Sequence, residues 1–307
     1  MQEKRVVVTG IGPLTAAGIG KDALWKNLVE GKINIKLEEC YVDGELWDKF
    51  YLHKIEGFDI KNFGIDKRIL EEIKTWKEGE EITDLYYLMA AVKLALDDSK
   101  LEYESEDNNI GCVVVHENPG LEQYISKYTT HAFETLKNKK ITKKLFVEEF
   151  YSALMKSSYD LQTFMVLFHV LKTFGIHGYS SFINSACSSG LYAIEAASQI
   201  IKTGRCSVVI VVAADYPRIY KYLWFKQLNM YAQDGKIKPF AKESNGLVFG
   251  DGGAGLVLED LEYALKRKTR IYAEYLGGGF SQEGWKVTVP AIGKKFLSKS
   301  YKRGLEI

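Results

Sequence analysis

One short stretch organises the rest of this sequence, Phe182-Ile183-Asn184-Ser185-Ala186-Cys187-Ser188-Ser189-Gly190. An apolar strand ends in a turn of small residues with Cys187 at its tip, and a helix patterned with alanine and isoleucine follows over Leu191 to Lys202. The free N–H groups of a helix N-terminus and the positive end of its dipole both favour the thiolate form of a cysteine there. The small neighbours permit the tight, crowded turn that a strained nucleophile elbow needs. We therefore consider Cys187 a candidate nucleophile, against the alternative that it is one more buried and inert cysteine.

Buried strands and amphipathic helices alternate along the rest of the chain. A helix is predicted from Thr83, its candidate N-cap, to Asp97-Asp98-Ser99, with apolar residues on one face. A second apolar helix is predicted over Leu161 to Phe174 and is closed by Gly175. The other predicted elements are strands at Val6–Val8, Ile110–Val115, Ser207–Ala214 and Arg270–Leu276, and helices at Lys21–Glu30 and Leu261–Lys266. This alternation is typical of an α/β layered fold.

Three regions are less regular. Residues 33–82 mix loops with short strand-like pieces, of which Ile55–Asp59 is the most orderly. Residues 117–160 are predicted as helices with aromatic faces, which core packing, a subunit interface or an apolar tunnel would each explain, and we favour packing. From Asp215 to Gly235 the chain is irregular and rich in aromatic residues.

Glycine-rich segments raise the question of a nucleotide or phosphate site. Gly10 and Gly12 follow the first strand, but Thr15 stands where a dinucleotide loop has its third glycine, and no acidic residue follows a second strand at the expected distance. The glycines between Gly246 and Glu259 lead into a strand rather than a helix, and no P-loop lysine follows them. We predict a turn after the first strand, a backbone that passes close beneath the active site in the later segment, and no cofactor.

The composition indicates a folded chain without the signature of nucleic-acid or membrane binding. The 307 residues suffice for one large or two ordinary domains, with 46% hydrophobic and 26% charged residues. The net charge of +1 gives no electrostatic reason to expect nucleic acid or an anionic membrane as a partner. The longest apolar run, Val208–Ala214, is too short to span a bilayer, and the N-terminus lacks the build of a signal peptide.

Cysteine usage points to a reducing compartment. The four cysteines are far apart and form no C-x-x-C pair: Cys40, Cys112, Cys187 and Cys206. They predict neither a disulfide framework nor a zinc site, so no metal is expected. A cytoplasmic location is the natural interpretation.

Several segments together resemble the β-ketoacyl synthases of the thiolase superfamily, specifically the elongating 3-oxoacyl-acyl-carrier-protein synthase type. The most specific segments are the cysteine turn, Ser185-Ala-Cys-Ser-Ser-Gly, and the glycine-rich run from Gly246 to Glu259. The other matching pieces are Arg5-Val-Val-Val-Thr-Gly-Ile-Gly, Ala90–Asp98, Ile110–Val115, Val208–Ala214 and Pro239-Phe240. They occur in family order from residue 5 to about residue 276.

The resemblance implies an α/β, thiolase-like fold, namely the N-terminal half of a five-layered α/β/α/β/α architecture with a helical, aromatic-rich insertion. It places a nucleophile-bearing ketosynthase N-terminal domain at residues 1–276 and the start of an incomplete C-terminal half at residues 277–307. It also implies that Cys187 is the catalytic nucleophile and that its backbone N–H contributes to the oxyanion hole. The implied partners are acyl carrier protein and a second ketosynthase-like chain, in a homodimer or heterodimer.

The sequence departs from the family where the remaining catalytic groups are expected. Family members supply two histidines, a lysine and a gating phenylalanine from a C-terminal half with motifs resembling H-G-T-G-T and N-x-x-x-G-H, and these motifs are absent here. All five histidines precede Cys187, and we interpret His169 and His177 as structural rather than as general bases. Smaller departures, which indicate relaxed geometry rather than new chemistry, occur at Ala241, Asn245-Gly246-Leu247 and Asp251.

Three hypotheses for the function follow. In the first, the chain is an acyltransferase of fatty-acid or polyketide-type biosynthesis: Cys187 accepts an acyl group from acyl carrier protein for decarboxylative condensation with malonyl-carrier protein, a step that requires the missing half. In the second, it is a non-catalytic ketosynthase-like partner subunit of a complete synthase, and its aromatic segment Tyr216 to Tyr231 forms the contact surface. In the third, it is a truncated, non-functional remnant whose exposed apolar face leads to association or aggregation.

Overall fold

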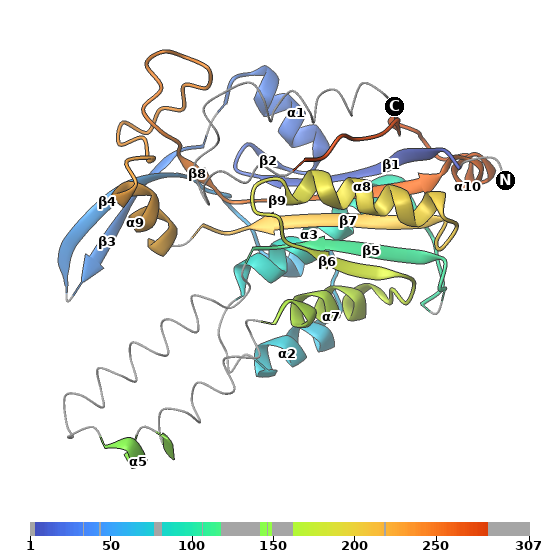
Figure 1. Cartoon of the computed structure of the whole chain (residues 1–307), viewed down its shortest axis with the longest axis horizontal. Helices are drawn as coiled ribbons and strands as arrows, with labels where there is room; N and C mark the ends of the chain where they lie inside the picture. Colours follow the sequence, from blue (N-terminus) through green and yellow to red (C-terminus); the bar gives the residue numbers. More distant parts are fainter. Residues whose placement is uncertain are drawn as a thin grey trace.

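One seven-stranded sheet forms the centre of the structure (Figure 1). The structure is a computed structural model that describes residues 4–32, 34–42, 44–76, 82–105, 107–117, 142–145, 147–148, 162–217 and 219–281. The strands are β1 (Val6–Thr15), β2 (Gly18–Ile19), β5 (Ile110–Val115), β6 (Ser180–Ile183), β7 (Val208–Asp215), β9 (Gly252–Asp260) and β10 (Ala273–Tyr275). Their order across the sheet is β10-β1-β9-β7-β5-β6, and β2 pairs with β1. Strands β5, β6 and β7 are parallel neighbours, whereas β1 pairs antiparallel with β9 and β10, and β7 pairs antiparallel with β9.

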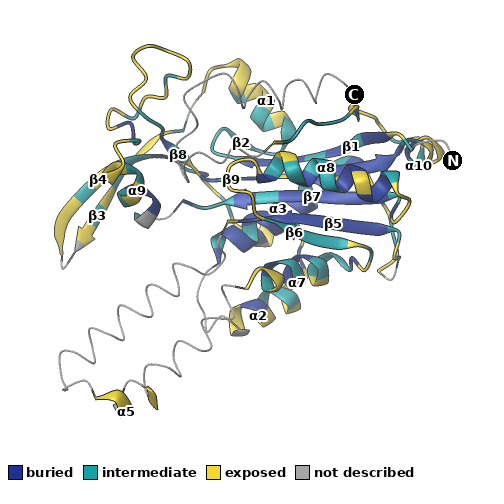
Figure 2. Ribbon diagram, viewed as in Figure 1, coloured by how far each residue is buried: buried dark blue, intermediate teal, exposed yellow. Residues whose placement is uncertain are grey.

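Helices bury both faces of this sheet. Helices α2 (Lys67–Trp76), α3 (Thr83–Ser99) and α7 (Thr163–Phe174) belong to one face, and α8 (Ser189–Lys202) covers the other. Along β5 the side chains alternate, because Cys112 and Val114 join the cluster around α3 while Val113 and Val115 join the cluster around α8. Figure 2 shows the central strands as buried along most of their length. Burial on both faces explains why these strands have nearly continuous apolar sequences.

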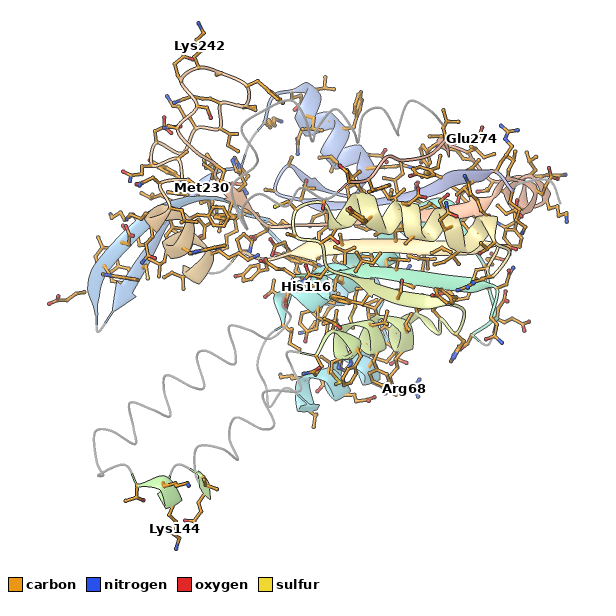
Figure 3. The ribbon with its side chains drawn as sticks, in the orientation of Figure 1. Arg68, His116, Lys144, Met230, Lys242 and Glu274 are labelled. Atoms are coloured by element: carbon orange, nitrogen blue, oxygen red, sulfur yellow. The ribbon has the colours of Figure 1, made fainter. Side chains whose placement is uncertain are left out.

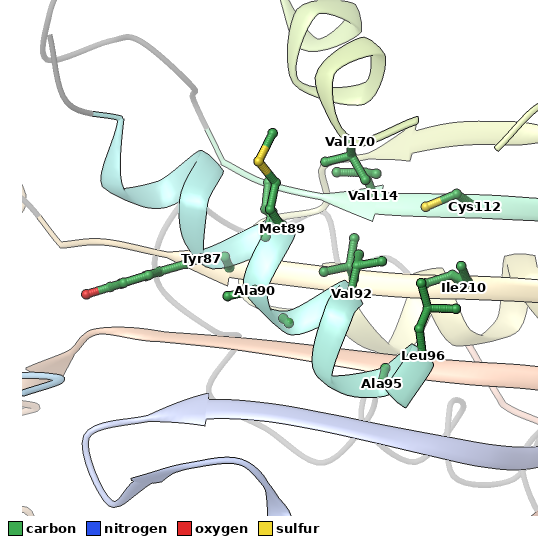
Figure 4. Close-up of a cluster of buried hydrophobic side chains, with 14 of the residues drawn as sticks. Tyr87, Met89, Ala90, Val92, Ala95, Leu96, Cys112, Val114, Val170 and Ile210 are labelled. Carbon is green, nitrogen blue, oxygen red and sulfur yellow. The ribbon is translucent and has the colours of Figure 1, made fainter. Parts of the chain in front are cut away.

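Helix α3 lies at the centre of the larger hydrophobic cluster (Figure 4). It lies directly on the sheet, because Gly10 and Gly12 of β1 and Gly255 of β9 offer no side chain to hold it away. A Cβ at any of these three glycines would lie 2.3 Å from a carbonyl oxygen of Ala91 or Ala95. The predicted turn at Gly10 and Gly12 is therefore wrong, since both residues lie inside the 10-residue strand β1. The close backbone approach expected in the later glycine-rich segment does occur at Gly255, but it is an approach to α3.

A smaller sheet and helix α9 (Ile219–Gln227) form a second, satellite cluster. The sheet contains β3 (Lys36–Val42), β4 (Glu45–His53) and β8 (Phe249–Gly250), in the order β3-β4-β8. The strand-like character expected at Ile55–Asp59 is not observed, because those residues lie between β4 and the 3-10 helix η1 (Ile60–Phe63). The segment from Asp215 to Gly235, which was expected to be irregular, contains α9. Tyr222 of α9 stacks on Phe50 of β4 with ring centroids 3.9 Å apart. Some of the aromatic residues in this segment therefore pack in the satellite core rather than face solvent.

Most other predicted elements are confirmed within a few residues. Helix α3 begins at Thr83, although Ile82 is its N-cap, and α7 ends at Phe174, with Gly175 as its C-cap at a left-handed φ of 59°. Helices α1 (Lys21–Val29) and α10 (Leu261–Arg267) also match. The aromatic helices predicted over 117–160 fall mostly outside the described residues, which include only the short α5 (Lys143–Leu145) and a few neighbours there, and residues 282–307 also lie outside them. None of the described helices combines the length and apolar character needed to cross a bilayer.

Candidate active site

The candidate nucleophile follows the carboxyl ends of three neighbouring parallel strands. Val115 at the end of β5 is paired with Ile183 at the end of β6 and with Ala213 near the end of β7. The polar residues that end or follow these strands are His116, Glu117, Asn184, Ser185, Cys187 and Asp215. In open α/β sheets, sites for chemistry form at this edge, because the loops that leave the strands meet there.

The turn between β6 and α8 is a strained elbow that serine side chains hold. Ala186, immediately before Cys187, has a left-handed φ of 49°, which is unfavourable for a residue with a Cβ. The buried Ser189 hydroxyl accepts a hydrogen bond from the Ser185 N–H at 2.6 Å and donates one to the Ala186 carbonyl at 2.7 Å. The N–H groups of Ser188 and Ser189 donate to the carbonyls of Ser185 and Ala186. The predicted tight turn is confirmed, and the role of the Cys187 N–H in an oxyanion hole stays a prediction.

The four thiols differ in exposure, and Cys40 in β3 is half-buried. Cys187 is exposed, whereas Cys112 and Cys206 are buried in the sheet region. Burial raises the pKa of Cys112 to about 12 and also raises the pKa of Cys206, so both are poor nucleophiles at neutral pH. The alternative that Cys187 is buried is wrong, because the elbow leaves residues 184–188 exposed at the edge of the sheet, and the reactivity of Cys187 stays a prediction. Cys187 is accessible to a thioester that approaches from solvent.

A buried lysine joins the segments that end β5 and β7 near the elbow. Lys221 Nζ, from α9, lies 2.8 and 2.9 Å from the two carboxylate oxygens of Asp215 and 2.5 Å from Glu117 Oε2. The lysine side chain is 9% exposed, whereas each carboxylate side chain is 50% exposed. Burial opposes the charged form, but the carboxylates of Asp215 and Glu117 outweigh it and raise the pKa of Lys221 above its usual value. Lys221 therefore carries a positive charge at this edge of the sheet.

Sequence reasoning did not identify this cluster. Lys221 lies in a segment that was expected to be irregular, and its partner Glu117 is more than 100 positions away along the chain. One signal was available, because Asp215 directly follows one strongly predicted buried strand and Glu117 lies two residues after the end of another. Acidic residues at the carboxyl ends of adjacent parallel strands lie close together at one edge of the sheet. No sequence rule predicts which basic residue pairs with them there.

The histidines of this region take different positions. His116 is buried immediately after β5 (Figure 3). Its Nε2 lies 3.0 Å from Asp84 Oδ2 of α3. The two groups are close without the alignment of a hydrogen bond, so they form an ion pair when the ring is protonated. His169 is buried in α7, in agreement with a structural role. His177 is exposed in the loop before β6, so burial does not support the structural interpretation for it.

Comparison with known proteins identifies the family. The family described as "Beta-ketoacyl synthase, N-terminal domain" matches residues 3–264. The chain belongs to the β-ketoacyl synthase family. The resemblance carried by the cysteine turn and the glycine-rich segment is thereby confirmed, and in this β-ketoacyl synthase chain helix α8 follows the cysteine turn. The role of Cys187 as nucleophile stays a prediction.

The curated relatives are 3-oxoacyl-acyl-carrier-protein synthases and related proteins. The 3-oxoacyl-[acyl-carrier-protein] synthase 2 of Vibrio cholerae serotype O1 is 27% identical over 300 residues, which cover 95% of this chain and 66% of the relative. Nodulation protein E of Rhizobium leguminosarum bv. trifolii is 24% identical over 295 residues, which cover 94% of this chain and 66% of the relative. The β-ketoacyl synthase chain thus spans just under two thirds of the length of these relatives.

Solved ketosynthases share its fold. A β-ketoacyl synthase from Burkholderia phymatum STM815 superposes with a TM-score of 0.76 at 23% identity, covering 99% of this chain and 70% of that chain. The ishigamide ketosynthase/chain length factor gives a TM-score of 0.78 at 19% identity, with the same coverage of 99% and 70%. The predicted α/β, thiolase-like fold is confirmed. The division into residues 1–276 and 277–307 stays a prediction.

Proposed function

We propose that this β-ketoacyl synthase chain is an acyltransferase of fatty-acid or polyketide-type biosynthesis that accepts an acyl group on Cys187. The exposure of Cys187 on a strained elbow before α8 carries this proposal. The buried Cys112 and Cys206 cannot meet a substrate, and the half-buried Cys40 lies in β3 of the smaller sheet rather than at the carboxyl ends of β5, β6 and β7. The Cys187 sulfur attacks the carbonyl carbon of a thioester, a new carbon–sulfur bond forms, and the donor's carbon–sulfur bond breaks. The departing thiolate takes up the proton that Cys187 released.

Acyl carrier protein is the proposed donor. The curated relatives bear carrier-protein synthase names, and one solved ketosynthase of similar fold is a type II polyketide synthase component in complex with its acyl-carrier protein. The subsequent decarboxylative condensation with malonyl-carrier protein is assigned to groups outside these 307 residues, since no histidine follows Cys187. We further propose a cytoplasmic location and assembly with a second ketosynthase-like chain.

Intact-mass spectrometry tests the acyltransfer step directly. The chain is incubated with an acyl-carrier protein, and we expect a mass increase of one acyl group that is absent in Cys187→Ala and retained in Cys112→Ala. No condensed product is expected when malonyl-carrier protein is added to this chain alone. Equal acylation of the wild-type protein and Cys187→Ala would overturn the assignment.

A second candidate is the non-catalytic partner subunit. The expected contact segment from Tyr216 to Tyr231 is used partly for internal packing, because Tyr222 and Tyr231 are buried against the smaller sheet. Leu191, in the first turn of α8, is 67% exposed, and this exposed apolar side chain favours a partner contact nearer the elbow. Co-purification with a full-length synthase without acylation of Cys187 would support this candidate over the acyltransferase.

A further inference from the structure

A continuous line of polar contacts connects Lys221 to the residue before the nucleophile. Lys221 pairs with the Glu117 carboxylate at 2.5 Å, and the Glu117 main-chain carbonyl accepts a hydrogen bond from Asn184 Nδ2 at 2.7 Å. Asn184 Oδ1 in turn accepts a hydrogen bond from the Ala186 N–H at 3.3 Å. The line therefore runs from α9, through the segment after β5, to the backbone of the elbow.

The elbow needs such support on its exposed side. Ala186 holds a left-handed backbone, which persists only when its surroundings hold it in place. Ser189 supports the elbow from the buried side, but Asn184 is exposed, and Glu117 is the residue that fixes its amide. Glu117 in turn lies beyond the end of β5, where no strand pairing restrains it. Its carboxylate is tied to the sheet through Lys221 and Asp215.

We propose that Lys221 and Asn184 are positioning residues for Cys187, with Lys221 acting through Glu117 and Asn184 acting on Ala186. Lys221 suits this role because it is buried and because it contacts the segments that end both β5 and β7. Without its charge, Glu117 and Asp215 are two carboxylates that repel each other, and the connection to the elbow is lost. An arginine at residue 221 retains the charge and can bond both carboxylates.

The role of Cys187 as acyl acceptor rests on the proposed function above, so the test uses a readout that does not depend on it. The rate of Cys187 alkylation by iodoacetamide at neutral pH is measured by peptide mass spectrometry. We expect Lys221→Met and Asn184→Ala each to slow this reaction roughly two- to fivefold, the share that one hydrogen bond contributes to holding the elbow in place. Lys221→Arg is expected to restore most of the rate.

Lys226→Met is the matched control. Lys226 also lies on α9 and also pairs with a carboxylate, at 2.5 Å, but its partner Asp48 belongs to β4 in the smaller sheet. This variant is expected to leave the alkylation of Cys187 unchanged. Labelling of the buried Cys112 is followed in every sample, because its increase reports unfolding. If Lys221→Met increases the labelling of Cys112, the exposed Asn184→Ala decides the question.

Two results would overturn the proposal. One is an unchanged alkylation rate in Asn184→Ala together with an unchanged rate in a folded Lys221→Met. The other is equal slowing in Lys221→Met and Lys226→Met. Acylation by acyl-carrier protein is measured separately on the same variants. A wild-type protein that is alkylated but never acylated at Cys187 would refute the proposed function and leave the positioning result intact.

Discussion

Gly12 and Ala91 lie so close that the structure leaves no room for a side chain between them. A Cβ at residue 12 would be 2.3 Å from the Ala91 carbonyl oxygen, and a Cβ at Gly255 on the neighbouring strand would be 2.3 Å from the same atom. The obstacle is helix backbone, which cannot rotate away as a flexible side chain does. The position of α3 on the sheet, and with it the main hydrophobic cluster, therefore depends on these glycines.

Replacement of Gly12 by alanine is expected to destabilise the fold. Overpacking against backbone forces a shift of α3, so we expect Gly12→Ala to lower the free energy of unfolding by about 3 kcal/mol. Gly190→Ala is the control, because a Cβ there meets no atom within 4 Å and the residue lies in helix α8. That variant is expected to be neutral or to gain up to about 1 kcal/mol. Urea unfolding followed by circular dichroism measures both, and a Gly12→Ala protein as stable as the wild type would contradict the packing argument.

Loss of the buried ion pair between Glu259 and Arg267 is expected to lower the free energy of unfolding far more than loss of an exposed pair. Glu259 is fully buried, with its carboxylate 3.1 Å from Arg267 Nε and 2.5 Å from the Thr9 hydroxyl. Arg267→Met leaves that carboxylate without its cation, so we expect a loss of about 3–5 kcal/mol in the free energy of unfolding. The comparison is Arg5→Met, which removes the exposed partner of Glu274 and is expected to have little effect. Similar losses in both variants would be inconsistent with this view.

The thiols are expected to react in the order of their exposure. In the native protein, iodoacetamide should label Cys187 rapidly and leave Cys112 unlabelled until the protein unfolds, because burial keeps Cys112 protonated and inaccessible. Peptide mapping after timed quenching distinguishes the two sites. Addition of denaturant is the control and should make their labelling rates similar. Rapid native labelling of Cys112 would show that the cluster around α3 opens readily.

Asp251 is expected to make the protein less stable as the pH rises. Burial raises its pKa to about 6 from an ordinary value of 3.8, against the hydrogen bonds that its Oδ2 accepts from the Ile55 N–H and the Tyr87 hydroxyl, each at 3.3 Å. The folded protein therefore holds this proton more tightly than the unfolded chain. Its contribution to stability is complete below pH 3.8, declines as the pH rises towards 6 and is lost above that value.

Asp251→Asn removes this titration. At pH 7 we expect the variant to exceed the wild type in free energy of unfolding by up to about 3 kcal/mol, and at pH 4 we expect the difference to be small. Urea denaturation at both pH values measures it. Asp66→Asn is the control, since Arg68 lowers the pKa of that exposed carboxyl and its loss should bring no gain at pH 7. A wild-type protein with a higher free energy of unfolding than Asp251→Asn at pH 7 would mean that the Asp251 carboxylate is stabilised by contacts other than its hydrogen bonds with Ile55 and Tyr87.

Local sequence patterns were sufficient for the elements that carry strong signals. The continuous apolar run of β5, the apolar repeat of α3 and the small residues around Cys187 are each encoded in neighbouring positions, so strand, helix and elbow were all predicted close to their observed places. The patterns failed where a residue type has two explanations. Gly10 and Gly12 are compatible with a turn or with a strand beneath a helix. Helix α9 was missed because its aromatic sequence has no clear helical periodicity.

The features that the sequence did not predict depend on contacts between residues far apart in the chain. The Asn184 amide bonds the carbonyl of a residue 67 positions away, and the Thr9 hydroxyl bonds a carboxylate 250 positions away. A periodic pattern extends over one element and contains no information on which distant groups it will meet. Residues 182–190 alone identify Cys187 as the candidate nucleophile, because the chemistry of a small-residue turn before a helix is local. The burial of Lys221 between Glu117 and Asp215 follows from the alignment of parallel strands, and that alignment exists only in the folded sheet.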